Sequence, residues 1–148
     1  MDALCALFMY LIVVGASAEG RRFIEIAVEQ NHEVALIEKD EAKAREVLKE
    51  SDIRAFASDI SDDEVLNEAE VGRADAVIAA THDDAQNLMA MVLAKEHQVK
   101  TRISLINQQS HASMFERLGV HVISDPAGIV ARQLYQYIDS DNINSKKA

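Results

Sequence analysis

The feature that most constrains this fold is an apolar segment that runs directly into a glycine-containing turn. Tyr10–Val14 is wholly apolar, and the sequence Gly15-Ala16-Ser17-Ala18-Glu19-Gly20 follows it. An amphipathic stretch covers 21–30, and a second apolar run, 34–37, ends at Glu38. A strand, a glycine turn, a helix, a second strand and an acidic residue within about thirty residues form the layout of a dinucleotide-binding half.

Each part of this layout has a chemical role in holding a nucleotide. Gly15 permits a turn that is too tight for a side chain. The helix that begins near Gly20 points unpaired N–H groups and its positive dipole end at a phosphate. Glu38 can accept hydrogen bonds from ribose hydroxyls, and its charge would repel a 2′-phosphate. Glu38 therefore favours NAD, ATP or ADP over NADP.

Two residues of the turn oppose the close approach of a phosphate. Ser17 occupies the place of the middle glycine, so a side chain sits where backbone and pyrophosphate normally approach closely. Glu19 adds a negative charge near the anion site. The geometry of a nucleotide site and tight binding of a nucleotide are therefore separate expectations.

Composition limits the possible partners. The chain has 148 residues and a net charge of −10, so a general nucleic-acid surface, which needs excess Lys and Arg, is not expected. The apolar run 3–16 is shorter than the ~20 residues that span a bilayer, and no basic segment precedes it, so we expect no direct membrane insertion. A single cysteine, Cys5, is consistent with a reducing cytoplasm.

Apolar and amphipathic segments alternate along the rest of the chain. They predict strands at 9–14, 34–38, 53–57, 74–80, 101–106 and 120–123, and helices at 20–30, 41–50, 62–70, 83–97 (or 84–97), 110–118 and 126–138. Such alternation predicts an α/β fold with a doubly wound parallel sheet in the order 3-2-1-4-5-6 between two helix layers. We expect an N-terminal extension, 1–8, one Rossmann-like domain, 9–138, and a polar C-terminal tail, 139–148.

Several further segments carry a family pattern. Beyond the glycine turn they are Val34-Ala35-Leu36-Ile37-Glu38-Lys39-Asp40, Ser58-Asp59-Ile60-Ser61-Asp62, Ala74-Asp75-Ala76-Val77-Ile78-Ala79-Ala80-Thr81, Asp84-Ala85-Gln86-Asn87-Leu88, Phe115-Glu116-Arg117-Leu118-Gly119-Val120 and Ile123-Ser124-Asp125-Pro126. With these segments, in order and at matching spacing, the chain resembles the Trk-type NAD-binding regulatory domain of potassium transport systems, also called the TrkA-N, KTN or RCK domain.

The resemblance implies a cytoplasmic domain that binds NAD or NADH, or alternatively ATP, ADP or AMP, and has no catalytic residues and no metal site. It places the phosphates at the turn Gly15, Ala16, Ser17, Ala18, Glu19 and Gly20, and the adenosine ribose at Glu38 with Lys39 beside it. It places the adenine at Asp59 and Ile60, and the phosphates or second ribose beside Ala80 and Thr81 in the strand-four loop. It also implies a homo-oligomer, built through the 126–138 helix, that regulates a potassium channel or transporter.

Two other functions compete with this one. Many family members have an arginine in the fifth strand where this chain has Leu105, and Arg102 lies on the opposite face of that strand. Together with Ser17, Leu105 favours a degenerate Rossmann module that associates without a nucleotide. A small NAD-dependent oxidoreductase is the other alternative, but it would need a substrate domain and an acid–base pair.

Some candidate residues also have simpler structural interpretations. Asp59 could bond only to its own loop. His82, Asp83 and Asp84 resemble metal ligands, but three adjacent side chains do not easily converge on one ion, and the following helix needs an acidic cap. The apolar residues of the last helix could pack on the sheet of the same subunit rather than on a second subunit.

Overall fold

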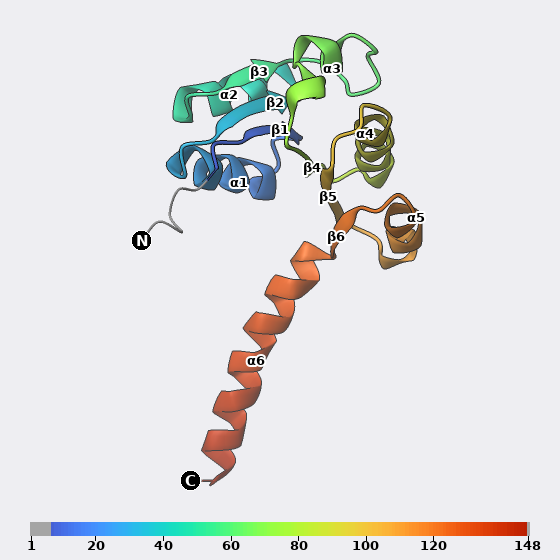
Figure 1. Ribbon diagram of the computed structural model, residues 1–148. Helices are drawn as coiled ribbons and strands as arrows, with labels where there is room; N and C mark the ends of the chain where they lie inside the picture. Colours follow the sequence, from blue (N-terminus) through green and yellow to red (C-terminus); the bar gives the residue numbers. More distant parts are fainter. Residues whose placement is uncertain (1–6, 148) are drawn as a thin grey trace.

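The centre of the structure is a six-stranded parallel sheet in the order β3-β2-β1-β4-β5-β6, which confirms the predicted fold class (Figure 1). The computed structural model describes residues 7–147. Its strands are β1 (Tyr10–Val14), β2 (Glu33–Ile37), β3 (Arg54–Phe56), β4 (Ala76–Ala79), β5 (Thr101–Ile106) and β6 (His121–Ser124). Its helices are α1 (Ala18–Glu29), α2 (Glu41–Glu50), α3 (Val65–Glu68), α4 (Asp84–Glu96), α5 (Ala112–Arg117) and α6 (Pro126–Lys147), with short 3-10 helices η2 (Val71–Arg73) and η3 (Gln109–His111).

Helices cover both faces of the sheet, and each face has its own apolar core. On one face, α1 and α2 pack Ile24, Ala27 and Val47 against alternate residues of β1 and β2. On the other face, α3, α4 and α5 contribute a second buried cluster that includes Met91 and Phe115. All five residues of β1 are buried because this strand lies between β2 and β4 and has helices on both sides.

The boundaries of α1, α3 and α5 differ from the sequence prediction. α1 begins at Ala18 rather than Gly20, because Ser17 caps it. The helix predicted over 62–70 is reduced to α3 and η2, which are separated at Glu70, a residue in the left-handed conformation. The helix predicted over 110–118 consists of η3 and, directly after it, α5, with no left-handed residue between them.

The last helix, α6, is longer than predicted and projects from the body of the molecule (Figure 1). The sequence predicts its end at Ile138, but the helix continues to Lys147. Of the predicted N-terminal extension, residues 1–6 lie outside the described part. No helix within residues 7–147 has both the length and the apolar character needed to cross a bilayer.

The crowding of the backbone at Gly20, between β1 and α1, can be tested by adding a Cβ. A Cβ at Gly20 would lie 2.3 Å from the carbonyl oxygen of Gly15. We expect Gly20→Ala to lower the free energy of unfolding by about 1–3 kcal/mol, because the buried turn has no room to relax. The control is Gly72→Ala, since an added Cβ there meets no atom within 4 Å. Urea denaturation measures both, and equal stabilities for the two variants would contradict the proposed crowding.

Candidate functional site

The turn after β1 closely approaches the loop after β4. Gly15 has φ +103°, and its N–H donates to the carbonyl of Ile37 at 2.9 Å. A Cβ on Gly15 would lie 2.7 Å from Cγ2 of Thr81. Both the dihedral angle and the contact therefore require glycine at this position.

Ser17 joins this turn to β4. Its Oγ accepts a hydrogen bond from the backbone N–H of Gly20 at 3.1 Å and donates one to the carbonyl of Ala80 at 2.5 Å. The first bond caps α1 at its N-terminus, and the second fastens the turn to the neighbouring strand end. Ser17, which stands at the position of the middle glycine, therefore makes two hydrogen bonds within the protein through its hydroxyl.

Glu38 lies directly after β2 and binds the same turn from the other side. Its Oε1 accepts from the N–H of Ala16 at 2.9 Å, and its Oε2 accepts from the N–H of Asp40 at 2.7 Å. The carboxylate is only half-buried and remains on the wall of the pocket. It therefore lies where the sequence places a ribose acceptor, with both oxygens bonded to backbone amides.

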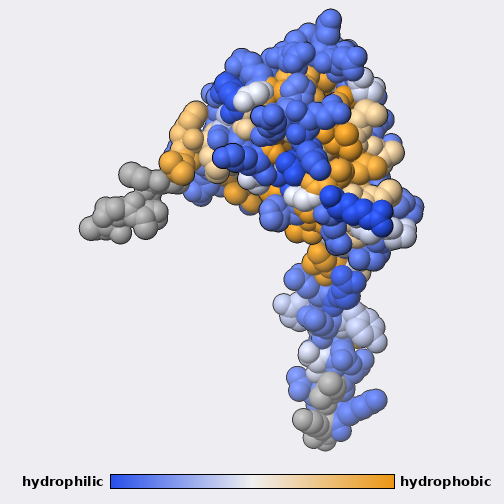
Figure 2. Space-filling view, turned by 45° about the vertical axis from the view of Figure 1, so that its right-hand side comes forward, coloured by the Kyte–Doolittle hydropathy of each residue, from blue (hydrophilic) through white to orange (hydrophobic). Residues whose placement is uncertain are grey.

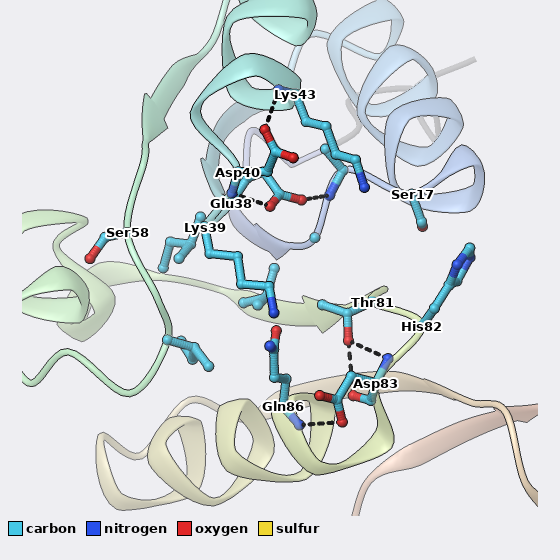
Figure 3. Close-up of a pocket in the computed structure, with 15 residues that line it drawn as sticks. Ser17, Glu38, Lys39, Asp40, Lys43, Ser58, Thr81, His82, Asp83 and Gln86 are labelled. Carbon is cyan, nitrogen blue, oxygen red and sulfur yellow. Dashed lines mark hydrogen bonds between the residues drawn. The ribbon is translucent and has the colours of Figure 1, made fainter.

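These groups surround a pocket of about 350 Å³ at the carboxyl ends of the first four strands (Figure 3). Seven of the twelve predicted site residues line it: Gly15, Ala16, Ser17, Glu38, Lys39, Ile60 and Thr81. Ligands of doubly wound folds bind at this edge, where the strand order reverses between β1 and β4.

The other five predicted site residues do not line the pocket: Ala18, Glu19, Gly20, Asp59 and Ala80. Asp59 accepts a hydrogen bond from the N–H of Ser61 at 2.9 Å, and this bond holds the pKa of its carboxyl below the ordinary value. Asp59 therefore bonds within its own loop, as the simpler structural interpretation expects. The neighbouring residue Ile60 lines the pocket.

Sequence reasoning missed eight lining residues: Val14, Ile37, Asp40, Lys43, Ser58, His82, Asp83 and Gln86. Lys43 is the most informative, because its side chain and that of Lys39 bring two positive charges to the pocket (Figure 3). A signal was present in the sequence, since Lys43 lies in the first turn of a helix whose cap, Asp40, follows Glu38 closely.

Comparison with known proteins agrees with this geometry. Residues 11–126 match the TrkA-N domain family. The chain belongs to the TrkA-N domain family. The Trk system potassium uptake protein TrkA homolog of Methanothermobacter thermautotrophicus is 29% identical over 117 residues, which is 78% of this chain and 54% of that protein. This chain thus spans about half the length of that relative.

Solved structures share the fold of this TrkA-N domain. The TrkA-N domain of the inner membrane protein ybaL from Escherichia coli superposes with a TM-score of 0.76 at 14% identity, covering 89% of this chain and 98% of that one. The GsuK channel bound to NAD gives 0.68 at 17% identity, covering 80% of this chain and 22% of the channel chain. At these identities the likeness extends to the fold alone.

A buried asparagine holds the β4 loop of the TrkA-N domain in place. Asn87 is fully buried, and its Oδ1 accepts from the N–H and the hydroxyl of Thr81 at 3.1 and 2.6 Å. Its Nδ2 donates to the carbonyls of Thr81 and Leu105, both at 3.0 Å. The amide thereby ties α4 to the ends of β4 and β5.

The acidic residues after β4 cap α4 and bond the loop after β5. Asp83 accepts from the N–H groups of Ala85 and Gln86 and caps α4. Asp84 points elsewhere, to the Asn107 N–H at 2.8 Å and the His111 Nδ1 at 2.7 Å. Within residues 7–147, no three His, Cys, Asp or Glu side chains are grouped as metal ligands.

The fifth strand presents no cation to the pocket. Arg102 donates to the carbonyls of Val99 and Leu118, both at 2.7 Å, so its guanidinium binds the opposite end of β5. The positive charges that line the pocket instead come from the β2 side, at Lys39 and Lys43.

The bonds of Asp84 predict a pH-dependent contribution to stability. Burial opposes ionisation of this carboxyl, but the backbone N–H of Asn107, with His111 and the Asn107 side chain, holds its pKa below the ordinary 3.8. A lowered folded-state pKa stabilises the fold above pH 3.8, and this contribution is lost as the pH falls through the folded-state value. We expect Asp84→Asn to cost about 1–3 kcal/mol at pH 7.

The difference between wild type and Asp84→Asn should begin to shrink as the pH falls below the ordinary Asp pKa of 3.8, because the unfolded chain then binds a proton that folded Asp84 does not. Urea unfolding between pH 3 and pH 7 measures it. A difference that stayed constant over this range would show that the charge of Asp84 contributes nothing.

Proposed function

We propose that this chain is a non-catalytic, nucleotide-binding regulatory domain or subunit that controls a potassium channel or transporter. The observation that carries the proposal is the pocket between the glycine turn and Glu38, in a chain of the TrkA-N family. NAD or NADH and the adenine nucleotides ATP, ADP and AMP are the candidate ligands. Regulation then follows if a nucleotide binds two shapes of the assembly with different affinity, because only that difference can shift their populations.

Chemical features of the pocket support an adenine nucleotide. Two lysines can pair with phosphate oxygens, while Ile37 and Ile60 offer apolar surface to a base. Glu38 can exchange its bonds to backbone N–H groups for ribose hydroxyls. The carboxylate would oppose a 2′-phosphate, so NADP and NADPH are disfavoured.

We place the domain in the cytoplasm, attached to the membrane through its transport partner and assembled with further copies of itself. The name of the relative from Methanothermobacter, a potassium uptake protein, supports this partner class. Exposed apolar residues on α6 support self-association. Val130, Leu134 and Ile138 recur at every fourth position, so they form one stripe, and they are 56%, 64% and 58% exposed.

A module that associates without a nucleotide is the second candidate function. It is favoured by one observation: Ser17 and Glu38 already bond to groups of the protein itself. Titration with nucleotides separates it from the first candidate, and turnover of a bound dinucleotide would instead indicate an oxidoreductase.

Nucleotide binding can be tested by thermal unfolding with NAD, NADH, ATP, ADP, AMP and NADPH added separately. A ligand at 100 times its Kd should stabilise the fold by ~2.7 kcal/mol, which raises Tm by several degrees. Glu38→Ala should abolish the rise in Tm. The rise in this variant is measured against the variant's own unliganded Tm, because Glu38 also holds two backbone amides and its loss lowers stability by itself.

Glu41→Ala is the matched control for this titration, since Glu41 is exposed and pairs with Arg45 on α2. It should retain the full response. If no nucleotide raises the Tm of the wild type, the nucleotide-sensing function is wrong and the association module takes its place.

Self-association through α6 can be tested by sedimentation velocity. We expect the wild type to sediment as a dimer or larger species at micromolar concentration. Leu134→Lys places a charge in the apolar stripe and should weaken association at least tenfold. Gln133→Lys adds the same charge at the adjacent position and should have little effect. A monomeric wild type, or equal behaviour of the two variants, would exclude α6 as the interface.

A further inference from the structure

The pocket lies over the β1–β3 side of the sheet and the loop after β4, and none of its lining residues comes from β5 or β6. Its lining comes from the ends of β1, β2, β3 and β4 and from the segments that follow them, up to Gln86. A dinucleotide extends across the switch point, so that its second nucleoside lies on the β4–β6 half. At 350 Å³ the pocket is near the lower limit of ligand sites, which are about 300–1,000 Å³.

On the second half of the sheet, the polar groups at the end of β5 are already engaged. Asp84 accepts from both the backbone N–H and the side-chain amide of Asn107, each at 2.8 Å, and from the N–H of Gln108 at 3.1 Å. These donors are the ones that a second ribose or phosphate would meet after passing over β4. They face inward to a carboxylate instead.

One contact between an acidic side chain and an imidazole lies between the phosphate turn and the loop after β4. Glu19, in the first turn of α1, has its carboxylate 3.5 Å from Nε2 of His82, in the loop after β4. The contact therefore joins the phosphate turn to the loop on the other side of the switch point. In Figure 3, Ser17 and His82 lie together at one side of the pocket, opposite Ser58.

The charge of Glu19 is held in place at this position. Its own backbone N–H, together with the hydroxyl of Ser17 and the imidazole of His82, keeps the pKa of the carboxyl below its ordinary value, although burial opposes this. At neutral pH the carboxylate thus occupies the positive end of α1, toward the β4 side. The lysines that can hold a phosphate, Lys39 and Lys43, lie on the β2 side.

We propose that the Glu19–His82 pair restricts this pocket to adenine mononucleotides by closing the passage that a dinucleotide needs to reach the second half of the sheet. The proposal rests on the nucleotide-binding function above and refines it. It also reverses the order in which the sequence ranks the ligands, since NAD and NADH came first there. A mononucleotide keeps its base, ribose and phosphate on the Glu38 and lysine side, and so leaves the pair closed.

Isothermal titration of the full chain with AMP, ADP and NAD tests this proposal. The decisive quantity is the ratio of Kd for NAD to Kd for AMP. We expect a ratio of at least ten in the wild type. Glu19→Ala should reduce the ratio at least fivefold, mainly by tightening NAD. His82→Ala should reduce it in the same direction, and the double variant should add little, because the two residues act as one pair.

Two further variants separate charge from obstruction. Glu19→Gln keeps the length of the side chain but not its charge, so it should give an intermediate ratio. Glu41→Gln removes one negative charge at the start of α2, away from the β4 loop, and should leave the ratio within twofold of the wild type. Circular dichroism of each variant verifies that it is folded.

The possible results distinguish this inference from the function on which it rests. If the wild type binds NAD as tightly as AMP, or if Glu19→Ala and His82→Ala leave the ratio unchanged, the pair does not select the ligand, but nucleotide binding stands. If neither the wild type nor any folded variant binds a nucleotide, both proposals are wrong. If the wild type binds AMP alone and Glu19→Ala gains NAD, both are supported.

Discussion

The rest of the structure depends on the close approach of the β1 turn to the end of β4. Gly15 and Gly20 bring two backbone segments together with no room for a Cβ, and the hydroxyl of Ser17 bonds across the remaining gap. Glu38 holds the same turn from the β2 side through the N–H of Ala16. The turn is thereby fixed by three neighbouring strands. A pocket built on this turn is preorganised, so the free energy of binding is not reduced by the entropic cost of ordering the loop.

The polar groups of this turn already bind the protein itself, and this sets a condition on any ligand. Where a ribose at Glu38 replaces the bonds from the two backbone amides, the displaced N–H groups need other acceptors. Phosphate oxygens are suitable acceptors for the N–H of Ala16, because charge-assisted bonds are stronger than neutral ones. A nucleotide can therefore compensate for what it displaces. A neutral nucleoside lacks the phosphate oxygens and leaves the freed N–H group unpaired.

The sequence predicted the sheet order and the turn because both follow from local patterns: buried parallel strands are continuous apolar runs, and a glycine turn followed by a helix is a short motif. It could not predict which turn residues face the pocket. Ala18 and Glu19 lie in the first turn of α1 rather than before it, since Ser17 begins the helix earlier. Ser58 and His82 line the pocket through loop conformation, which periodicity does not encode. The length of α6 was missed because most residues after Ile138 are polar, so no apolar periodicity marks that part of the helix.

Hydrogen bonds, joined by one step along the β5 backbone, connect the pocket with the start of α6. Thr81 lines the pocket and bonds Asn87, which in turn bonds the carbonyl of Leu105 near the end of β5. The next carbonyl, of Ile106, accepts from the N–H of Asp125, directly before α6. A contact path does not by itself establish coupling. The path transmits a signal only if a ligand favours one position of Thr81 over another. Any such change is linked to β5 through Asn87, because the side-chain amide of Asn87 bonds both Thr81 and Leu105. Small displacements at the pocket would then reach α6 enlarged, since a helix that projects from the body moves farthest at its tip (Figures 1 and 2).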